Sequence, residues 1–237
     1  MTQFIDPPMN YQPPDQNIPL DAWDLLSPQL TEKRRDRMLA TAANRTQFVR
    51  LAIQDVHQPH NVSACIRSAE AFGVQSVDVV TLKGKFSTST VARGVDEWVD
   101  IYRHDSVDQC IRHLHDSGYI VAAAFPHGQA VALEDLPIDK PIAVVFGNEH
   151  EGLALEWREK ADLCFTIPMY GIVESLNISV SAAITLHSLT SRIRKAHNPQ
   201  FFHLSSTDQK RLLNNWICRQ IKTWPSQLPR LRTDRRT

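Results

Sequence analysis

The sequence predicts an α/β fold in which a mainly parallel β-sheet is flanked by helices. Short runs of branched and apolar residues alternate along the chain with longer stretches that have apolar residues at helical spacing, which is typical of this class. Residues 141–146 (PIAVVF) are apolar throughout, as expected for a strand that helices cover on both faces. The chain has 237 residues, of which 42% are hydrophobic and 22% charged, so it can bury a sizeable core. Ligands of such folds bind beyond the carboxyl ends of the strands.

The chain opens with a proline-rich segment, residues 1–28, which is expected to form an extended or partly disordered arm. Trp23, Leu25 and Leu26 are apolar, and we expect them to dock this arm onto the body of the protein. A charged helix is expected next, over residues 32–43, and its Lys and Arg side chains make one side basic. That side suits a solvated surface and a contact with nucleic-acid phosphates equally well.

A strand is expected over residues 47–55, because this run alternates and is rich in branched residues. Asn61 is expected to cap the following helix, residues 61–72. The apolar side chains of that helix recur at helical spacing and predict its buried stripe: Val62, Cys65, Ile66, Ala69 and Phe72. Arg67 lies off the centre of this stripe, so its guanidinium needs an anionic partner. The residues leave open whether that partner is a ligand or Glu70, one turn further along.

The rest of the chain continues the alternation of strands and helices. Strands are expected over residues 76–81, 98–102, 119–125, 141–146 and 164–167. Helices are expected over residues 106–117, 154–161, 176–196 and 207–224. Residues 83–94 form a polar and basic loop suited to a flexible substrate contact. The segment from Pro225 onward is expected to be a polar, basic tail.

Several kinds of site find no support in the sequence. Gly147 and Gly152 have the spacing of a Walker A loop, but Leu and Ala follow where that loop has Lys and Ser or Thr. The chain contains no G-x-G-x-x-G and no G-x-S-x-G, which disfavours a standard dinucleotide site and a hydrolase nucleophile elbow. The four cysteines form no C-x-x-C pair, and His57 and His60 have no third ligand nearby, so no metal is expected.

The net charge of the chain is zero, but its charges are unevenly distributed. Residues 192–237 carry 11 Lys or Arg against two Asp, whereas the preceding 191 residues carry 15 basic and 24 acidic side chains. A basic tail on an acidic body favours a polyanionic partner, although a solubilising tail would have the same composition. No apolar run reaches the length of a membrane span, and the start of the chain lacks the features of a signal peptide. We therefore expect no membrane span, and the four widely spaced cysteines, which indicate no disulfide framework, fit a reducing cytoplasm.

Three stretches carry a more specific signal: residues 61–74 (NVSACIRSAEAFGV), 143–153 (AVVFGNEHEGL) and 167–183 (IPMYGIVESLNISVSAA). In order and spacing they resemble the three motifs of the SpoU/TrmH family of the SPOUT superfamily, the RNA ribose 2′-O-methyltransferases. The resemblance covers residues 30–195. It is strongest to the branch that methylates a guanosine ribose in the D-loop of tRNA.

The resemblance implies the activity, the fold and the partners of this chain. It implies S-adenosylmethionine as cofactor, RNA (preferably tRNA) as substrate, a homodimer, and a C-terminal trefoil knot, which general topology rules would exclude. It also divides the chain into an arm with a basic helix (residues 1–45), a methyltransferase domain (46–196) and a basic helical extension (197–237). Three alternatives remain: a ribosomal RNA target, a catalytically silent RNA-binding protein on the same fold, and an α/β enzyme for a small anionic substrate.

The resemblance also assigns roles to residues. The catalytic set that it implies consists of Arg67, Glu149, Ser175, Asn177 and Asn61. The cofactor is expected to contact mostly backbone groups around Ala124, Gly147, Ile167 and Leu176. RNA is expected to contact the basic side chains Arg34, Arg35, Lys83, Lys85, Arg93 and Arg211. Because a guanidinium is a poor base at neutral pH, we expect Arg67 to orient the attacking oxygen and to stabilise its developing negative charge.

Overall fold

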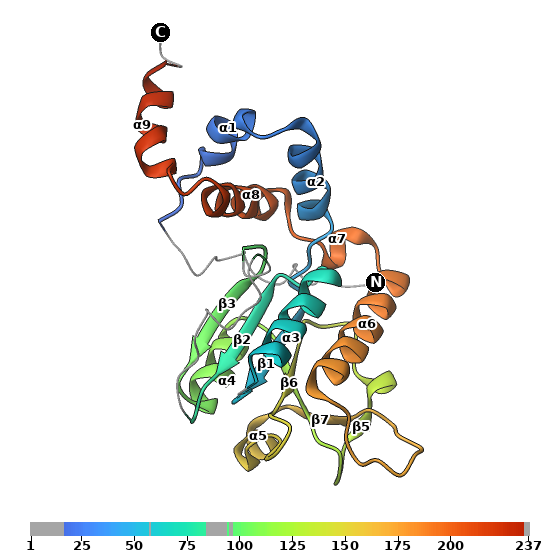
Figure 1. Ribbon diagram of the computed structural model, residues 1–237. Helices are drawn as coiled ribbons and strands as arrows, with labels where there is room; N and C mark the ends of the chain where they lie inside the picture. The colour runs from blue at the N-terminus through green and yellow to red at the C-terminus, as the bar shows by residue number, and fades with distance from the viewer. Residues whose placement is uncertain (1–16, 57, 84–93, 95–96, 235–237) are drawn as a thin grey trace. The chain divides into compact units, whose positions relative to one another are not determined.

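The computed structural model of the protein describes residues 17–56, 58–83, 94 and 97–234 (Figure 1). Within them the chain forms two compact units. The sheet unit comprises Thr46–Phe202, and the helical unit comprises the described parts of Asn10–Arg45 and His203–Thr237. No helix among the described residues is both long and apolar enough to cross a membrane.

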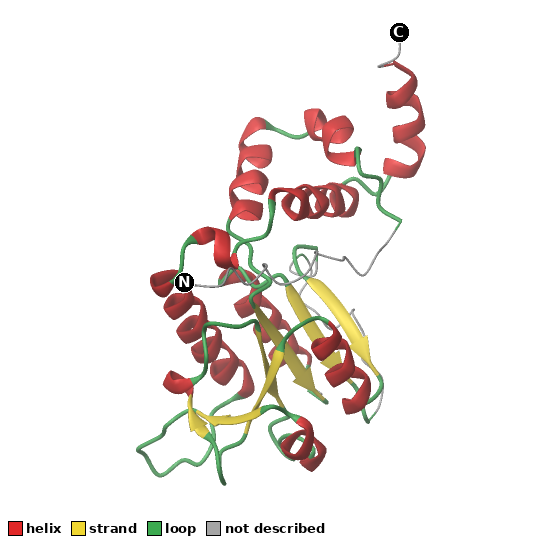
Figure 2. Cartoon of the chain, turned by 180° about the vertical axis from the view of Figure 1, so that it is seen from behind, coloured by secondary structure: helices red, strands yellow, loops and turns green. Residues whose placement is uncertain are grey.

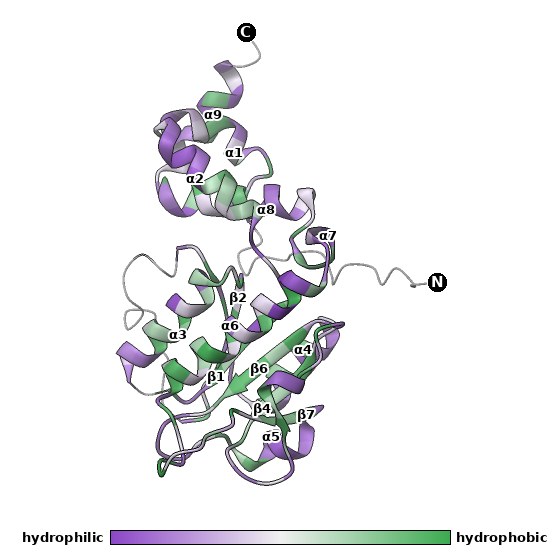
Figure 3. Cartoon of the chain, turned by 90° about the vertical axis from the view of Figure 1, so that its right-hand side faces the viewer, coloured by the Kyte–Doolittle hydropathy of each residue, from purple (hydrophilic) through white to green (hydrophobic). Residues whose placement is uncertain are grey.

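The sheet unit is built on a parallel sheet of seven strands in the described residues, in the order β3-β2-β1-β6-β4-β7-β5 (Figure 1). The strands are β1 (Val49–Gln54), β2 (Ser76–Val80), β3 (Asp100–His104), β4 (Ile120–Ala124), β5 (Val131–Ala132), β6 (Ile142–Phe146) and β7 (Leu163–Thr166). The central strand β6 is fully buried and hydrophobic along its length (Figure 3), because helices cover both faces of the sheet. The predicted fold class is therefore confirmed.

Helices cover the two faces of this sheet in pairs. Helices α3 (Pro59–Ala71) and α6 (Ile178–Ala196) pack against each other and bury their apolar stripes on one face, where Ile66 and Leu186 are completely buried. Helices α4 (Val107–Asp116) and α5 (Leu155–Lys160) cover the other face, with Trp157 completely buried. A short 3₁₀ turn, η3 (Leu133–Asp135), and helix α7 (Pro199–Phe202) complete the unit.

The helical unit joins the two ends of the described chain (Figure 2). It contains α1 (Ala22–Leu26), the 3₁₀ turn η1 (Ser27–Gln29), α2 (Glu32–Ala43), α8 (Ser206–Gln220) and α9 (Trp224–Asp234). The backbone N–H of Trp23 donates to Asn214 Oδ1 of α8 at 2.7 Å, and the side chain of Trp216 is completely buried. This unit therefore has its own small core, in which apolar side chains of α1 pack on α8.

The structure corrects two predictions about the chain ends. Trp23, Leu25 and Leu26 were expected to dock an extended arm onto the body of the protein. In the structure they belong to helix α1 and are buried within the helical unit. The expected tail from Pro225 is helix α9, because Pro225 lies in the first helical turn, where its missing N–H costs no hydrogen bond. Residues 1–16 of the arm lie outside the described part of the chain.

Two predicted helix starts also move. Helix α3 begins at Pro59, whose fixed φ suits the first helical position, so Asn61 lies inside the helix and does not cap it. Helix α6 begins at Ile178, two residues later than expected, because the side chain of Asn177 accepts a hydrogen bond from the Ser179 N–H and caps it. The first shift frees the Asn61 side chain for other contacts, and in the second the Asn177 oxygen caps α6 while its amide nitrogen donates to Asn61.

Candidate functional site

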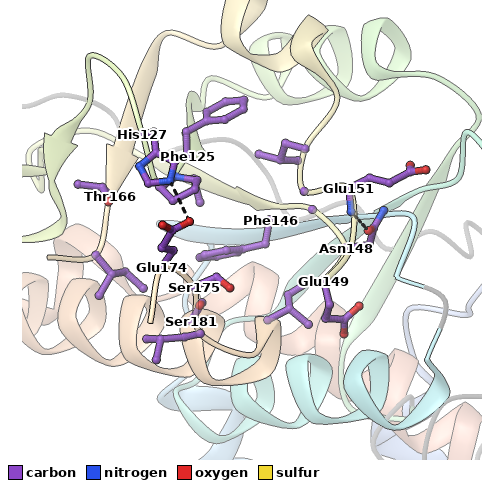
Figure 4. Close-up of a pocket in the computed structure, with 18 of the residues that line it drawn as sticks. Phe125, His127, Phe146, Asn148, Glu149, Glu151, Thr166, Glu174, Ser175 and Ser181 are labelled. Atoms are coloured by element: carbon purple, nitrogen blue, oxygen red, sulfur yellow. Dashed lines mark hydrogen bonds and ion pairs between the residues drawn. The ribbon is translucent and has the colours of Figure 1, made fainter. Parts of the chain in front are cut away.

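A pocket of about 480 Å³ opens at the carboxyl ends of β4, β6 and β7 (Figure 4). Its walls are the loop after β4, the turn after β6, the loop after β7 and the first turns of α6. This is the edge at which open α/β sheets bind ligands, and the volume is that of a small-molecule site. The lining is mainly apolar, with aromatic rings from Phe125, Phe146 and Phe165.

All four residues expected near the cofactor line this single pocket: Ala124, Gly147, Ile167 and Leu176. They come from segments up to 52 positions apart, and the parallel sheet brings them to one edge. The four residues therefore lie around the same pocket in the structure. That each of them contacts a cofactor remains a prediction.

The turn after β6 is held in one shape by its own residues. A Cβ on Gly147 would lie 2.1 Å from the carbonyl carbon of Gly152, so only glycine fits there. Asn148 Oδ1 accepts hydrogen bonds from the N–H groups of His150 (2.9 Å) and Glu151 (2.7 Å). Gly152 closes the turn with a φ of +69°. The G-x-x-x-x-G spacing therefore builds a rigid turn that presents Glu149 beside the pocket.

The three motifs meet in a hydrogen-bonded group that we call the motif cluster, Asn61, Glu149 and Asn177. The Asn61 amide donates to Glu149 Oε1, and its Oδ1 accepts from Asn177 Nδ2 at 3.3 Å. Asn177 Oδ1 accepts from the backbone N–H of Ser179 at 2.8 Å, so the residue that caps α6 also binds α3. The cluster therefore links α3, the turn after β6 and α6. Ser175, the remaining predicted partner of this set, is exposed and lines the pocket.

Arg67 is exposed on α3 and makes no hydrogen bond or ion pair with any residue that the structure describes. The alternative of an internal salt bridge with Glu70 is therefore wrong. Arg67 lies six residues after Asn61, about 9 Å along the helix and about 120° around it. Among the described residues, none occupies its guanidinium, which can therefore bind the anion of a ligand.

The predicted RNA contacts fall on different parts of the structure. Lys83 donates to Glu151 Oε2 at 2.6 Å, and this hydrogen bond raises the pKa of the exposed lysine. In the helical unit, Arg34 donates to Gln220 Oε1 at 2.6 Å, Arg35 is half-buried, and Arg211 pairs with Asp208 at 3.4 Å. Lys85 and Arg93 lie outside the described residues. Their roles toward RNA remain predictions.

Sequence reasoning missed a buried polar group on the α4 face, which we call the buried ion network: Arg50, Asp78, His104 and His113. Asp78 Oδ2 accepts from Arg50 Nε at 2.5 Å and Asp78 Oδ1 from His104 Nε2 at 2.7 Å. Arg50 Nη2 donates to His113 Nε2 at 2.9 Å. Burial opposes ionisation of Asp78, but Arg50 and His104 outweigh it and lower the pKa of the carboxyl.

Ligand-type atoms of Asp78, His104 and Cys110 lie within 4.8 Å of one another. The guanidinium of Arg50 already takes the place that a cation would occupy beside Asp78. The donor set is therefore satisfied as an ion network, and we assign it no metal.

Three comparisons place the chain among known proteins. Residues 49–187 match the model of the SpoU rRNA Methylase family. The tRNA (guanosine(18)-2′-O)-methyltransferase of Borreliella burgdorferi is 34% identical over 173 residues, which are 73% of this chain and 79% of that protein. The crystal structure of the Aquifex aeolicus TrmH/SpoU tRNA modifying enzyme is similar with a TM-score of 0.71 and 28% identity, and the match covers 80% of this chain and 98% of that one. An AdoMet-bound rRNA methyltransferase from Sinorhizobium meliloti has a TM-score of 0.56 and 27% identity, over 65% and 60% of the two chains.

Proposed function

Because the chain belongs to the SpoU rRNA methylase family, we propose that it transfers a methyl group from S-adenosylmethionine to a ribose 2′-hydroxyl of RNA. The membership confirms the family that the three motifs indicated. The relatives named above for tRNA support a tRNA substrate, and a guanosine in the D-loop is the proposed target. The observation that carries the proposal is the meeting of all three motifs beside one pocket at the carboxyl edge of the sheet.

The residues of the pocket fit the cofactor. Its aromatic and aliphatic lining suits a purine ring, and the carboxylates of Glu149 and Glu174 suit the positive charges of a sulfonium and an ammonium. The sulfonium supplies an activated methyl group when the cofactor is bound. The solved relative from Sinorhizobium meliloti carries AdoMet, which supports the same assignment for this chain.

The residues of the chain have to position the ribose and to stabilise the charge that develops on its oxygen. Arg67, which has no partner in the described structure, binds the ribose oxygen or the adjacent phosphate and stabilises negative charge there. The motif cluster holds Glu149 and the start of α6 in a fixed geometry, which keeps the reacting groups in line. In the described structure, Arg67 forms no hydrogen bond with the residues of this cluster.

The proposal includes a homodimer in the cytoplasm and the family's trefoil knot. Six large apolar side chains of the loop after β7 and of α6 are exposed among the residues that the structure describes: Tyr170, Ile172, Val173, Leu176, Val180 and Ile184. An apolar surface of this kind, next to the pocket, supports an interface between copies of the chain. The basic side chains of the helical unit, Arg34, Arg35 and Arg211, are proposed to hold RNA phosphates.

The test is methyl transfer from labelled S-adenosylmethionine to unmodified bulk tRNA and to rRNA, with the modified nucleoside identified by mass spectrometry. A 2′-O-methylguanosine in tRNA is the expected product. The same nucleoside in rRNA alone would move the substrate to ribosomal RNA. Tight RNA binding without transfer to either RNA would contradict the enzymatic proposal and favour a silent RNA-binding protein.

A further inference from the structure

An imidazole and a carboxylate face each other across the rim of the pocket (Figure 4). His127 belongs to the loop after β4, and Glu174 to the loop before α6. His127 Nε2 and Glu174 Oε2 are 4.0 Å apart, which is too far for a hydrogen bond. Their side chains are 72% and 84% exposed. The two groups are therefore close enough to act on one ligand, but they hardly satisfy each other.

The other two carboxylates at the pocket are already engaged. Three carboxylates line it in the described structure, and Glu149 accepts a hydrogen bond from Asn61, while Glu151 accepts one from Lys83 at 2.6 Å. Glu174 is the carboxylate of this lining that accepts no hydrogen bond from a described residue. A cationic ligand group that enters the pocket thus finds its open acceptor at Glu174.

Arg158 of α5 holds the loop that carries His127 through a hydrogen bond and a contact with an aromatic ring. Its Nη2 donates to the carbonyl oxygen of His127 at 2.8 Å, and its guanidinium lies over the ring of Phe125 at 4.2 Å. Gly128, the next residue of this loop, has a φ of +96°, a backbone conformation that glycine adopts without strain. The backbone of His127 is therefore held in place, and its imidazole projects over the pocket toward Glu174.

We infer that His127 and Glu174 together bind the amino-acid end of S-adenosylmethionine. The α-ammonium donates to the free carboxylate of Glu174, and the α-carboxylate accepts an N–H of the His127 imidazole. The two ends of the zwitterion thus meet an N–H donor and a carboxylate acceptor that lie side by side, and hydrogen bonds in which one partner is ionised are stronger than neutral ones. The apolar lining then takes the adenosine part. This inference rests on the proposed function, since it assumes the same cofactor.

The test is a calorimetric titration of the full chain with three ligands. S-adenosylmethionine and S-adenosylhomocysteine both carry the amino-acid end, whereas 5′-methylthioadenosine lacks it. Glu174→Gln and His127→Ala are each expected to raise the Kd of the first two ligands about tenfold. Both variants are expected to leave the Kd of 5′-methylthioadenosine unchanged.

Two control variants remove the same kinds of groups elsewhere. Glu156→Gln removes a carboxylate of α5 that is bonded to Lys160 at 2.6 Å, and His115→Gln removes an imidazole paired with Asp162. Both controls should bind all three ligands as the wild type does. An unchanged Kd in the Glu174 and His127 variants would overturn the inference. An equal rise in the Kd of all three ligands would also overturn it, because it would mean that the pair only holds the two loops together. A wild-type chain that binds no S-adenosylmethionine would instead overturn the proposed function.

Discussion

The buried ion network and the motif cluster are both polar groups built from several elements of the same sheet unit, but they are opposites in pairing and exposure. In the network, Asp78 is completely buried and bonded to both Arg50 and His104. Its neighbours Arg50 and His104 are each about 5% exposed. The charges of Arg50 and Asp78 are thus matched within the network, and the one buried polar atom of the network without a partner in the described structure is Nδ1 of His104.

The motif cluster has the reverse character. Glu149 is half-buried and Asn177 exposed, and the hydrogen bond between Asn61 and Asn177 is long, at 3.3 Å. Arg67, on the same helix as Asn61, has no partner among the described residues. A displaced pKa and a set of metal-type ligands would point to the network as the functional site. The pairing of the side chains instead favours the motif cluster as the functional site, because a binding site needs polar groups whose hydrogen bonds and charges the chain itself does not satisfy.

The largest expected effect is the loss of stability when the buried network is broken. Asp78→Ala leaves the Arg50 guanidinium buried without its carboxylate, so the free energy of unfolding should fall by about 3–5 kcal/mol. Urea denaturation followed by circular dichroism measures this change. Asp108→Ala removes an exposed carboxylate bonded to Lys160 and should leave the urea midpoint unchanged. A variant at Asp78 as stable as the wild type would show that the network contributes nothing to folding.

The next effect concerns the unpaired arginine and should appear in turnover alone. Arg67→Ala removes a charge that no described residue uses, so the melting temperature should stay constant. Methyl transfer should fall by about 10²–10³-fold, the usual loss for a group that stabilises developing negative charge. Arg112→Ala changes another exposed arginine, on α4, and serves as the control that should retain full turnover. Substantial activity of the Arg67 variant would end its proposed catalytic role.

A smaller effect separates the two functions of Asn177. Asn177→Asp keeps the side-chain oxygen that caps α6 but loses the amide that donates to Asn61. We expect its stability to be retained and its turnover to fall about tenfold, because the cluster loses alignment. Asn177→Ala should in addition lose about 1 kcal/mol of stability with the cap. If both variants lost only stability, the residue would be a helix cap without a part in the reaction.

The sequence predicted what depends on local pattern and on motif order. Alternating apolar runs identified the parallel sheet, and the motif spacing brought Gly147 and Ile167 to one pocket. The sequence did not predict which side chains of different helices, strands and turns form hydrogen bonds with one another. The Asn61 amide was assigned to a helix start, although it bonds to Glu149, 88 positions away, and Arg67 was offered a pairing with Glu70 that the structure lacks.

The missed network has the same cause. Arg50 and Asp78 lie inside strands that are mostly apolar, and the sequence of a single strand does not reveal which charged side chain it meets on the next strand. A charged residue in the middle of a buried strand was the available signal, because such a charge requires a partner. The short strand β5 was missed because two residues carry no periodicity.

The smallest effect is a dependence of stability on pH that belongs to the network. Burial, followed by the charge of Arg50, lowers the pKa of His113. The unfolded chain therefore binds a proton at His113 before the folded chain does, so stability is fully present above the unfolded pKa of about 6.5 and declines as the pH falls below it. Asp78 does not contribute in this range, because its pKa is lowered and the stability that depends on its charge is lost only in stronger acid.

The urea midpoint of the wild type should thus be lower at pH 5.5 than at pH 7.5. In His113→Gln this difference should shrink, whereas in His115→Gln, which changes an exposed imidazole outside the network, it should persist. A slope that survives in His113→Gln would mean that another group takes up the proton, and the network would be less tightly matched than its hydrogen bonds indicate.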